Sequence, residues 1–133
     1  MGPSPPLRRI LLVEDDPDIR AIARLAMESV GRFEVRACAS GREVLPVVRE
    51  FKPDLILLDV MMPGMDGPAT LQALRGEPGA GAIPVVFMTA KADTADRAHY
   101  HRLGVAGVIA KPFDPMTLCD EIRAIWVRVG QQA

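Results

Sequence analysis

The chain has 133 residues, of which 49% are hydrophobic and 25% are charged, a composition typical of one globular domain with a buried core. Its 17 acidic and 16 basic residues give a formal net charge of −1, so no overall positive field favours nucleic acid or an anionic membrane, and we expect neither as a direct partner. The sequence shows no apolar signal-peptide core and no run of membrane-spanning length, which predicts a cytoplasmic location.

Short apolar runs alternate with segments of helical periodicity from residue 8 onward. Before them, the proline-rich residues 1–7 predict a disordered lead-in, so we expect the folded domain to cover residues 8–130. The predicted strands cover about residues 8–13, 33–38, 54–59, 84–89 and 106–110. The predicted helices cover about residues 17–30, 40–51, a short stretch from 66 or 67, 94–103 and 115–129.

Start and stop signals support these helices. Asp16 precedes a proline, so we interpret it as the cap of the first helix rather than as a metal ligand, and we expect Gly31 to end that helix. Residues 40–43 read Ser-Gly-Arg-Glu, a capping-box pattern for the second helix, and Pro46 predicts a kink or a late start there. Asp114, followed by a proline, predicts the start of the last helix.

The alternation of strand and helix predicts an α/β fold. The strands at 54–59 and 84–89 are apolar on both faces, which indicates a parallel sheet covered by helices on both sides. We find no repeat, linker or second domain in the sequence, and therefore expect one domain.

Polar residues follow four of the apolar runs at their C-terminal ends. In open α/β sheets, ligands bind at the carboxyl ends of the strands. If the first and third strands are neighbours, the carboxylates of Glu14, Asp15 and Asp59 converge there and repel one another unless a cation lies between them. A cluster of oxygen donors suits Mg²⁺ better than zinc.

Two further residues equip this edge for phosphoryl transfer. The charge of Lys111 together with that of Mg²⁺ balances the three carboxylates, and Thr89 offers a hydroxyl donor. In such a site the cations neutralise the phosphoryl oxygens while one carboxylate attacks in line.

Four motifs carry a resemblance to a known family. Residues 13–16 (VEDD), 58–67 (LDVMMPGMDG), 88–90 (MTA) and 110–113 (AKPF) together resemble the CheY-like receiver domain of two-component response regulators. The resemblance covers about residues 8–130, with the motifs in the family's order and spacing. It implies a flavodoxin-like, doubly wound sheet of five parallel strands in the order 2-1-3-4-5, with five helices.

The resemblance also implies a metal site and an acceptor. Asp59 is expected to accept a phosphoryl group from a sensor histidine kinase or a phosphotransfer protein. Mg²⁺ is expected to be held by Asp15, by Asp59 and by the backbone carbonyl of Met61, with Glu14 acting through water.

Other residues are expected to form the switch. By resemblance, Lys111 pairs with the acceptor and the phosphoryl group, and its bond to Pro112 is cis. Thr89, followed by Ala90, moves toward the phosphoryl group. The family often has an aromatic residue three positions before the lysine, where this chain has Val108, so we expect the signal to travel through the loop after Thr89. The expected partner surface is the face formed by residues 94–103, 106–110 and the last helix.

Some residues have two open interpretations. Arg97, Tyr100 and Arg102 share one predicted helix, and a partner surface and a solvated face are both consistent with the sequence. Cys38 and Cys119 have no metal-ligand spacing and are expected to be free thiols in a reducing compartment.

The sequence therefore predicts a stand-alone phosphoacceptor, without an output domain, that switches the binding of an unknown protein. It is expected not to be an enzyme, because its phosphoryl transfer and autodephosphorylation are self-directed. One alternative is a receiver-like module that binds partners without being phosphorylated. Another is an aspartyl-phosphate hydrolase, a class that wants a second Asp two residues after the first, where this chain has Met61.

Overall fold

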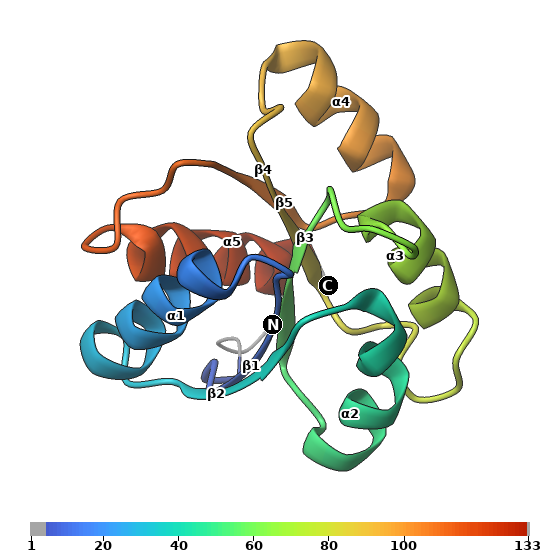
Figure 1. The fold of residues 1–133 in the computed structure, drawn as a ribbon, viewed down its shortest axis with the longest axis horizontal. Coiled ribbons are helices and arrows are strands. Elements are labelled where there is room, and N and C mark those ends of the chain that lie inside the picture. Colours follow the sequence, from blue (N-terminus) through green and yellow to red (C-terminus); the bar gives the residue numbers. More distant parts are fainter. Residues whose placement is uncertain (1–4, 133) are drawn as a thin grey trace.

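The described residues, 5–132 of a computed structural model, form a five-stranded parallel sheet between two layers of helices (Figure 1). The strand order is β2-β1-β3-β4-β5, which confirms the predicted doubly wound topology. The strands are β1 (Arg9–Val13), β2 (Glu34–Cys38), β3 (Leu55–Asp59), β4 (Val85–Thr89) and β5 (Gly107–Ala110).

Five α-helices cover the two faces of the sheet. They are α1 (Pro17–Leu25), α2 (Val44–Phe51), α3 (Gly67–Arg75), α4 (Thr94–Leu103) and α5 (Leu118–Gln132). Helices α1 and α5 lie on one face, and α2, α3 and α4 lie on the other (Figure 1).

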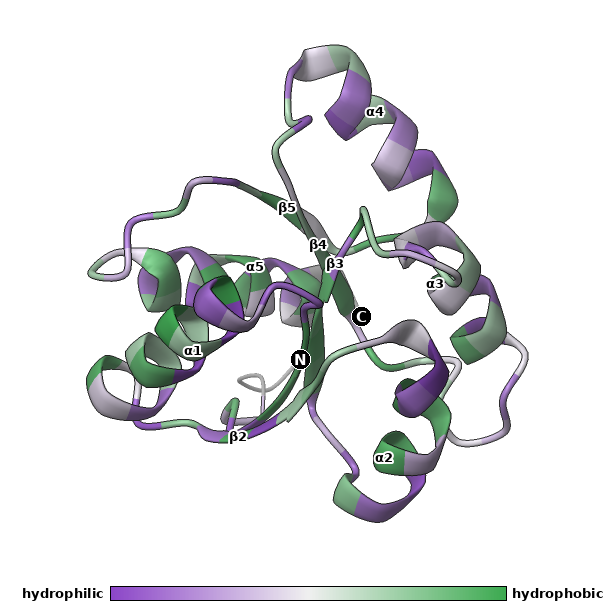
Figure 2. Ribbon diagram, in the orientation of Figure 1, coloured by the Kyte–Doolittle hydropathy of each residue, from purple (hydrophilic) through white to green (hydrophobic). Residues whose placement is uncertain are grey.

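Alternating side chains of the strands build one core on each face. Leu11 and Ile56 point toward α2 and α3, whereas their neighbours Ile10 and Leu55 point toward α1 and α5, and all four are fully buried. Figure 2 shows the hydrophobic strands enclosed by helices whose outer sides are hydrophilic. Because β3 and β4 are buried along their whole length, every position before their terminal Asp59 and Thr89 is apolar, as the sequence indicated.

The first helical segment ends at Gly31, as predicted, but its last turn has a different form. Its last turn, Ala26–Val30, is π-helical, with the Gly31 amide donating to the carbonyl of Ala26. The left-handed residue that follows is Arg32, at φ 59°. Gly31 is needed for another reason, because a Cβ there would lie 2.6 Å from the Sγ of Cys119 on α5.

Two other helix starts differ in detail. The capping box at Ser40 does not form as predicted, since the carboxylate of Glu43 accepts from the Ala39 amide and a 3₁₀ turn, Gly41–Glu43, comes first. Helix α2 thus starts late, with Pro46 in its first turn, where no amide is needed. Helix α5 begins at Leu118, because hydrogen bonds to Asp114 first close a tight turn.

The segment before β1 contacts α5. Residues 1–4 of the predicted disordered lead-in lie outside the described residues. Residues 5–7 form neither helix nor strand, but the indole N–H of Trp126 donates to the carbonyl of Pro5 at 2.7 Å, and Leu7 packs against the core. Disorder of the lead-in stays a prediction.

The structure bears on two further expectations. Cys38 and Cys119 are both buried and free, and burial raises the pKa of the Cys38 thiol to about 11, so this thiol is unreactive at neutral pH. Among residues 5–132, no helix has the length and apolar character needed to cross a bilayer.

Candidate functional site

The register of the sheet brings the predicted site residues to one edge. Val13 pairs with Leu58, Asp59 pairs with Met88, and Thr89 pairs with Ala110. Each pairing ends its ladder, so the residues at the carboxyl ends of β1, β3, β4 and β5 lie side by side. This edge is where an open α/β sheet places its ligands.

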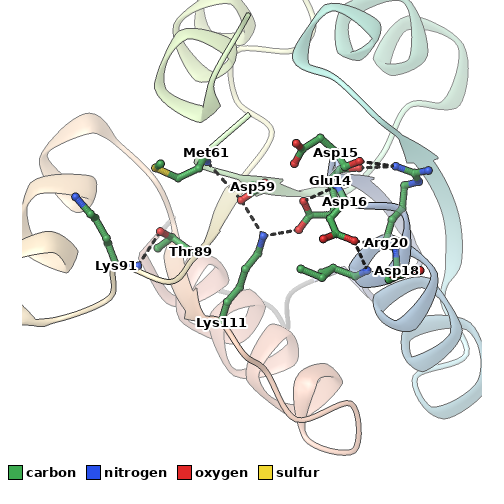
Figure 3. Close-up of polar contacts among 11 residues, drawn as sticks. Glu14, Asp15, Asp16, Asp18, Arg20, Asp59, Met61, Thr89, Lys91 and Lys111 are labelled. Atoms are coloured by element: carbon green, nitrogen blue, oxygen red, sulfur yellow. Dashed lines mark hydrogen bonds and ion pairs between the residues drawn. The ribbon is translucent and has the colours of Figure 1, made fainter. Parts of the chain in front are cut away.

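Lys111 lies at the centre of the site (Figure 3). Its ammonium donates to Oδ1 of Asp59 at 3.0 Å and also to Oε1 of Glu14. The side chains of both acceptors are at most 4% exposed, and that of Lys111 is 16% exposed. Lys111 follows β5 and Glu14 follows β1, and these two strands are not neighbours in the sheet. Lys111 therefore links their ends, and it also contacts Asp59 at the end of β3 between them.

Three carboxylates form the acidic side of the site. Glu14, Asp15 and Asp59 each offer an oxygen, and these oxygens lie within 4.8 Å of one another. Asp15 is nearer to solvent than the other two. Three negative charges face the single charge of Lys111, and the excess matches a divalent cation with a preference for oxygen ligands. The residues present thus fit Mg²⁺.

The loop after β1 is held in place by its own side chains. Asp16 caps α1 by accepting from the amides of Asp18 and Ile19. Its carboxylate therefore has the role the sequence indicated, and it does not belong to the acidic cluster. Arg20 on α1 donates to the carbonyl of Glu14 at 2.8 Å, which fixes the backbone that carries the acids. Arg20 could not be recognised from the sequence, because an arginine in the first turns of a helix carries no signal for a carbonyl partner.

Thr89 lies beside the acids at the end of β4. The residue is 1% exposed, and its Oγ accepts from the Lys91 amide at 3.0 Å (Figure 3). The hydroxyl oxygen of Thr89 thus accepts a hydrogen bond from the loop, and the hydroxyl proton is still free to be donated. Ala90 is exposed and lines an open hollow with Lys91 and Asp93.

Two further predicted positions lie at the rim of the site. The amide of Met61 donates to Oδ1 of Asp59 at 3.4 Å, and its side chain is exposed. The bond between Lys111 and Pro112 is cis. The metal-binding role of the Met61 carbonyl stays a prediction.

Burial and charge shift the protonation of the site. Burial raises the pKa of Glu14 to about 7, and the hydrogen bond with Asp59 adds to this, while Lys111 opposes it. Burial lowers the pKa of Lys111, but its hydrogen bonds and its attraction to Glu14 and Asp59 outweigh burial, so the pKa is raised overall. Lys111 is therefore charged at neutral pH.

The shift at Glu14 predicts a pH-dependent stability. Its pKa is about 7 in the folded chain and near the ordinary value of 4.5 in the unfolded chain, so the unfolded chain loses this proton first as the pH rises. In metal-free buffer, the unfolding free energy should therefore fall by about 3 kcal/mol between pH 4.5 and pH 8 through Glu14 alone. Urea unfolding of wild type and Glu14→Gln at several pH values measures this as the difference between the two curves.

A matched control separates the pH dependence due to buried Glu14 from the effect of removing any exposed carboxylate. Glu28 is an exposed acid whose partner is Arg24 one turn away, and Glu28→Gln should follow the wild-type curve within about 0.5 kcal/mol. If the unfolding free energies of wild type and Glu14→Gln changed in parallel with pH, the raised pKa of Glu14 would be contradicted.

The fold and the placement of this site define a class of protein, the flavodoxin-like receivers of two-component signalling. The family model described as the response regulator receiver domain matches residues 10–123, and the chain belongs to this family. The resemblance to receiver domains that the four motifs indicated is thereby confirmed.

Relatives of this chain are response regulators. The chain is 38% identical over 117 residues to the DNA-binding response regulator MtrA of Mycolicibacterium smegmatis, and the match covers 88% of this chain and 50% of the relative. It is 37% identical to the response regulator Rre1 of Synechocystis, over 87% of this chain and 48% of the relative. This chain thus spans about half the length of these curated relatives. Our expectation that it does not contact nucleic acid directly stays a prediction.

Solved structures agree with the fold. The chemotaxis response regulator CheY4 of Vibrio cholerae superposes with a TM-score of 0.81 at 28% identity, covering 90% of this chain and 99% of that one. A response regulator from Desulfuromonas acetoxidans has a TM-score of 0.79 at 28% identity, covering 94% of this chain and 98% of that one.

Proposed function

We propose that Asp59 accepts a phosphoryl group from the phosphohistidine of a sensor histidine kinase or of a phosphotransfer protein, and that this switches the binding of a protein partner. The observation that carries the proposal is the ammonium of Lys111, which bridges the buried carboxylates of Asp59 and Glu14. Such an ammonium is placed to receive an anion built on Asp59.

The proposed reaction uses residues already in place. A carboxylate oxygen of Asp59 forms a bond to phosphorus as the bond from phosphorus to the donor imidazole breaks, and the imidazole takes up a proton from water. Lys111 pairs with the phosphoryl oxygens, and the hydroxyl of Thr89 turns to donate to them.

We propose that Asp15, Asp59 and the backbone carbonyl of Met61 hold Mg²⁺, with Glu14 acting through water. When bound, the ion supplies positive charge beside the phosphoryl oxygens. The acidic cluster supports this, because its charge exceeds that of Lys111.

The proposed output is a change in the surface that binds the downstream protein. Movement of Thr89 is proposed to change the face formed by α4, β5 and α5, where the downstream protein binds. The chain modifies only itself, so in this proposal it is a switch and not an enzyme with turnover. Its two free, buried thiols support a cytoplasmic location.

Treatment with a small phosphodonor tests the proposal. Incubation with acetyl phosphate and Mg²⁺ should add the mass of one phosphoryl group to the intact protein, and EDTA should prevent the addition. The adduct should be lost in hydroxylamine, which cleaves acyl phosphates. A protein that gains no mass under these conditions would instead support the module that binds partners without being phosphorylated.

A further inference from the structure

Helix α4 is attached to the domain in an unusual way. Of its residues, all of which the structure describes, Tyr100 alone is buried. Figure 2 shows the helix as largely hydrophilic. A helix that buries one side chain gains little from apolar contact, so its position depends on the polar contacts at its two ends.

Tyr100 fills the space beside β4 and β5. Its ring meets that of Phe87 edge to face, with centroids 5.3 Å apart, and both rings share one core cluster with Val108. Both interpretations open in the sequence, a partner surface and a solvated face, are thus wrong for Tyr100, because the residue is 7% exposed. Helix α4 thus contributes an aromatic ring to the core cluster that contains Val108.

Arg97 makes the polar contact at the N-terminal half of α4. Its Nε donates to the carbonyl of Ala92 at 2.7 Å, and its Nη1 donates to the carbonyl of Val108 at 2.9 Å. One planar guanidinium therefore ties together the loop after Thr89, helix α4 and strand β5, a task its rigid fork suits better than a lysine.

Arg75 makes the contact at the other end. From α3 it donates to the carbonyl of Gly104, just after α4, and to the carbonyls of Gly81 and Ile83. None of these carbonyls belongs to the loop after Thr89. The two arginines thus hold the same helix, but only one of these two side chains contacts that loop.

We propose that Arg97 is the residue that couples the phosphoacceptor site to helix α4. The inference rests on the proposed function, since it needs a phosphoryl group on Asp59. When the hydroxyl of Thr89 turns toward that group, the Lys91 amide loses its acceptor and the loop that carries the Ala92 carbonyl rearranges. Arg97 then loses its bond to the Ala92 carbonyl and keeps only its bond to the Val108 carbonyl. With one of its two polar contacts gone, α4 shifts relative to β5.

Hydrogen exchange with and without acetyl phosphate and Mg²⁺ tests this, with phosphorylation followed by intact mass in the same samples. In wild type, phosphorylation should change amide exchange in α4 by roughly tenfold, as expected for one lost hydrogen bond. Arg97→Ala should be phosphorylated within about twofold of wild type, because Arg97 does not touch the acids, and its α4 exchange should be the same in both states.

Arg75→Ala is the control for a merely structural role. It should raise exchange at the end of α4 in both states and keep the response to phosphorylation. Arg97→Lys, which keeps the charge, covers the case in which Arg97→Ala does not fold, and it should also lose the response. If either folded Arg97 variant is phosphorylated and α4 responds as in wild type, the coupling is overturned. If wild type itself is not phosphorylated, the proposed function fails and the coupling fails with it.

Discussion

Asp59→Asn is expected to abolish phosphorylation of this chain by acetyl phosphate. The amide keeps the shape of the side chain and an oxygen for Lys111, but it has no anionic oxygen to attack phosphorus. Phosphorylated protein should fall below detection, a loss of at least about 100-fold in rate. Intact-mass measurement over a time course, with equal Mg²⁺ for both proteins, gives the two rates.

Asp16→Asn is the matched control for this change. Asp16 is a neighbouring acid, but its oxygen caps α1 and an asparagine can cap equally well. This variant should be phosphorylated within about twofold of wild type. Phosphorylation that survives Asp59→Asn, or that disappears in Asp16→Asn, would place the acceptor elsewhere.

Lys111→Met is expected to affect both reaction and stability. Without the ammonium, no side-chain cation pairs with the oxygens of a group on Asp59, and the rate of phosphorylation should fall by about 10²–10³-fold. The unfolding free energy at pH 8 without Mg²⁺ should fall by up to about 3–5 kcal/mol, because Glu14 and Asp59 remain buried without their partner. Mass measurements and urea unfolding give the two effects separately.

Changes of pH and Mg²⁺, and a second lysine variant, test whether the effect of Lys111→Met comes from the buried carboxylates. The loss of stability should be smaller at pH 5.5, where Glu14 is protonated, and Mg²⁺ should restore more stability to Lys111→Met than to wild type. Lys91→Met removes an exposed lysine from the loop after Thr89 and should change stability by less than about 0.5 kcal/mol. Equal losses in the two variants would mean that Lys111 is only a surface charge.

The sheet and the site could be predicted because each rests on a local signal. The strands are short apolar runs, and the polar residues that end them must meet at one edge once the strands are parallel. Lys111 was expected beside Asp59 for that reason, and the structure places it 3.0 Å away.

Other features depend on packing between distant segments. Ile22 and Val30 keep helical spacing in the first helix, yet they are 48% and 46% exposed, since the small Ala23 and Ala26 face the core instead. Arg97 looked like one more charge on a polar helix. Its partner is a carbonyl on a later strand, and backbone carbonyls carry no mark in a sequence.

The contact between Trp126 and Pro5 gives the protein a natural optical label. Trp126 is the single tryptophan of the chain. Its indole is bonded to the segment that leads into β1, at the end of the sheet opposite the acids. Intrinsic fluorescence should therefore follow global unfolding, so the stabilities of all the variants above can be compared without an added dye.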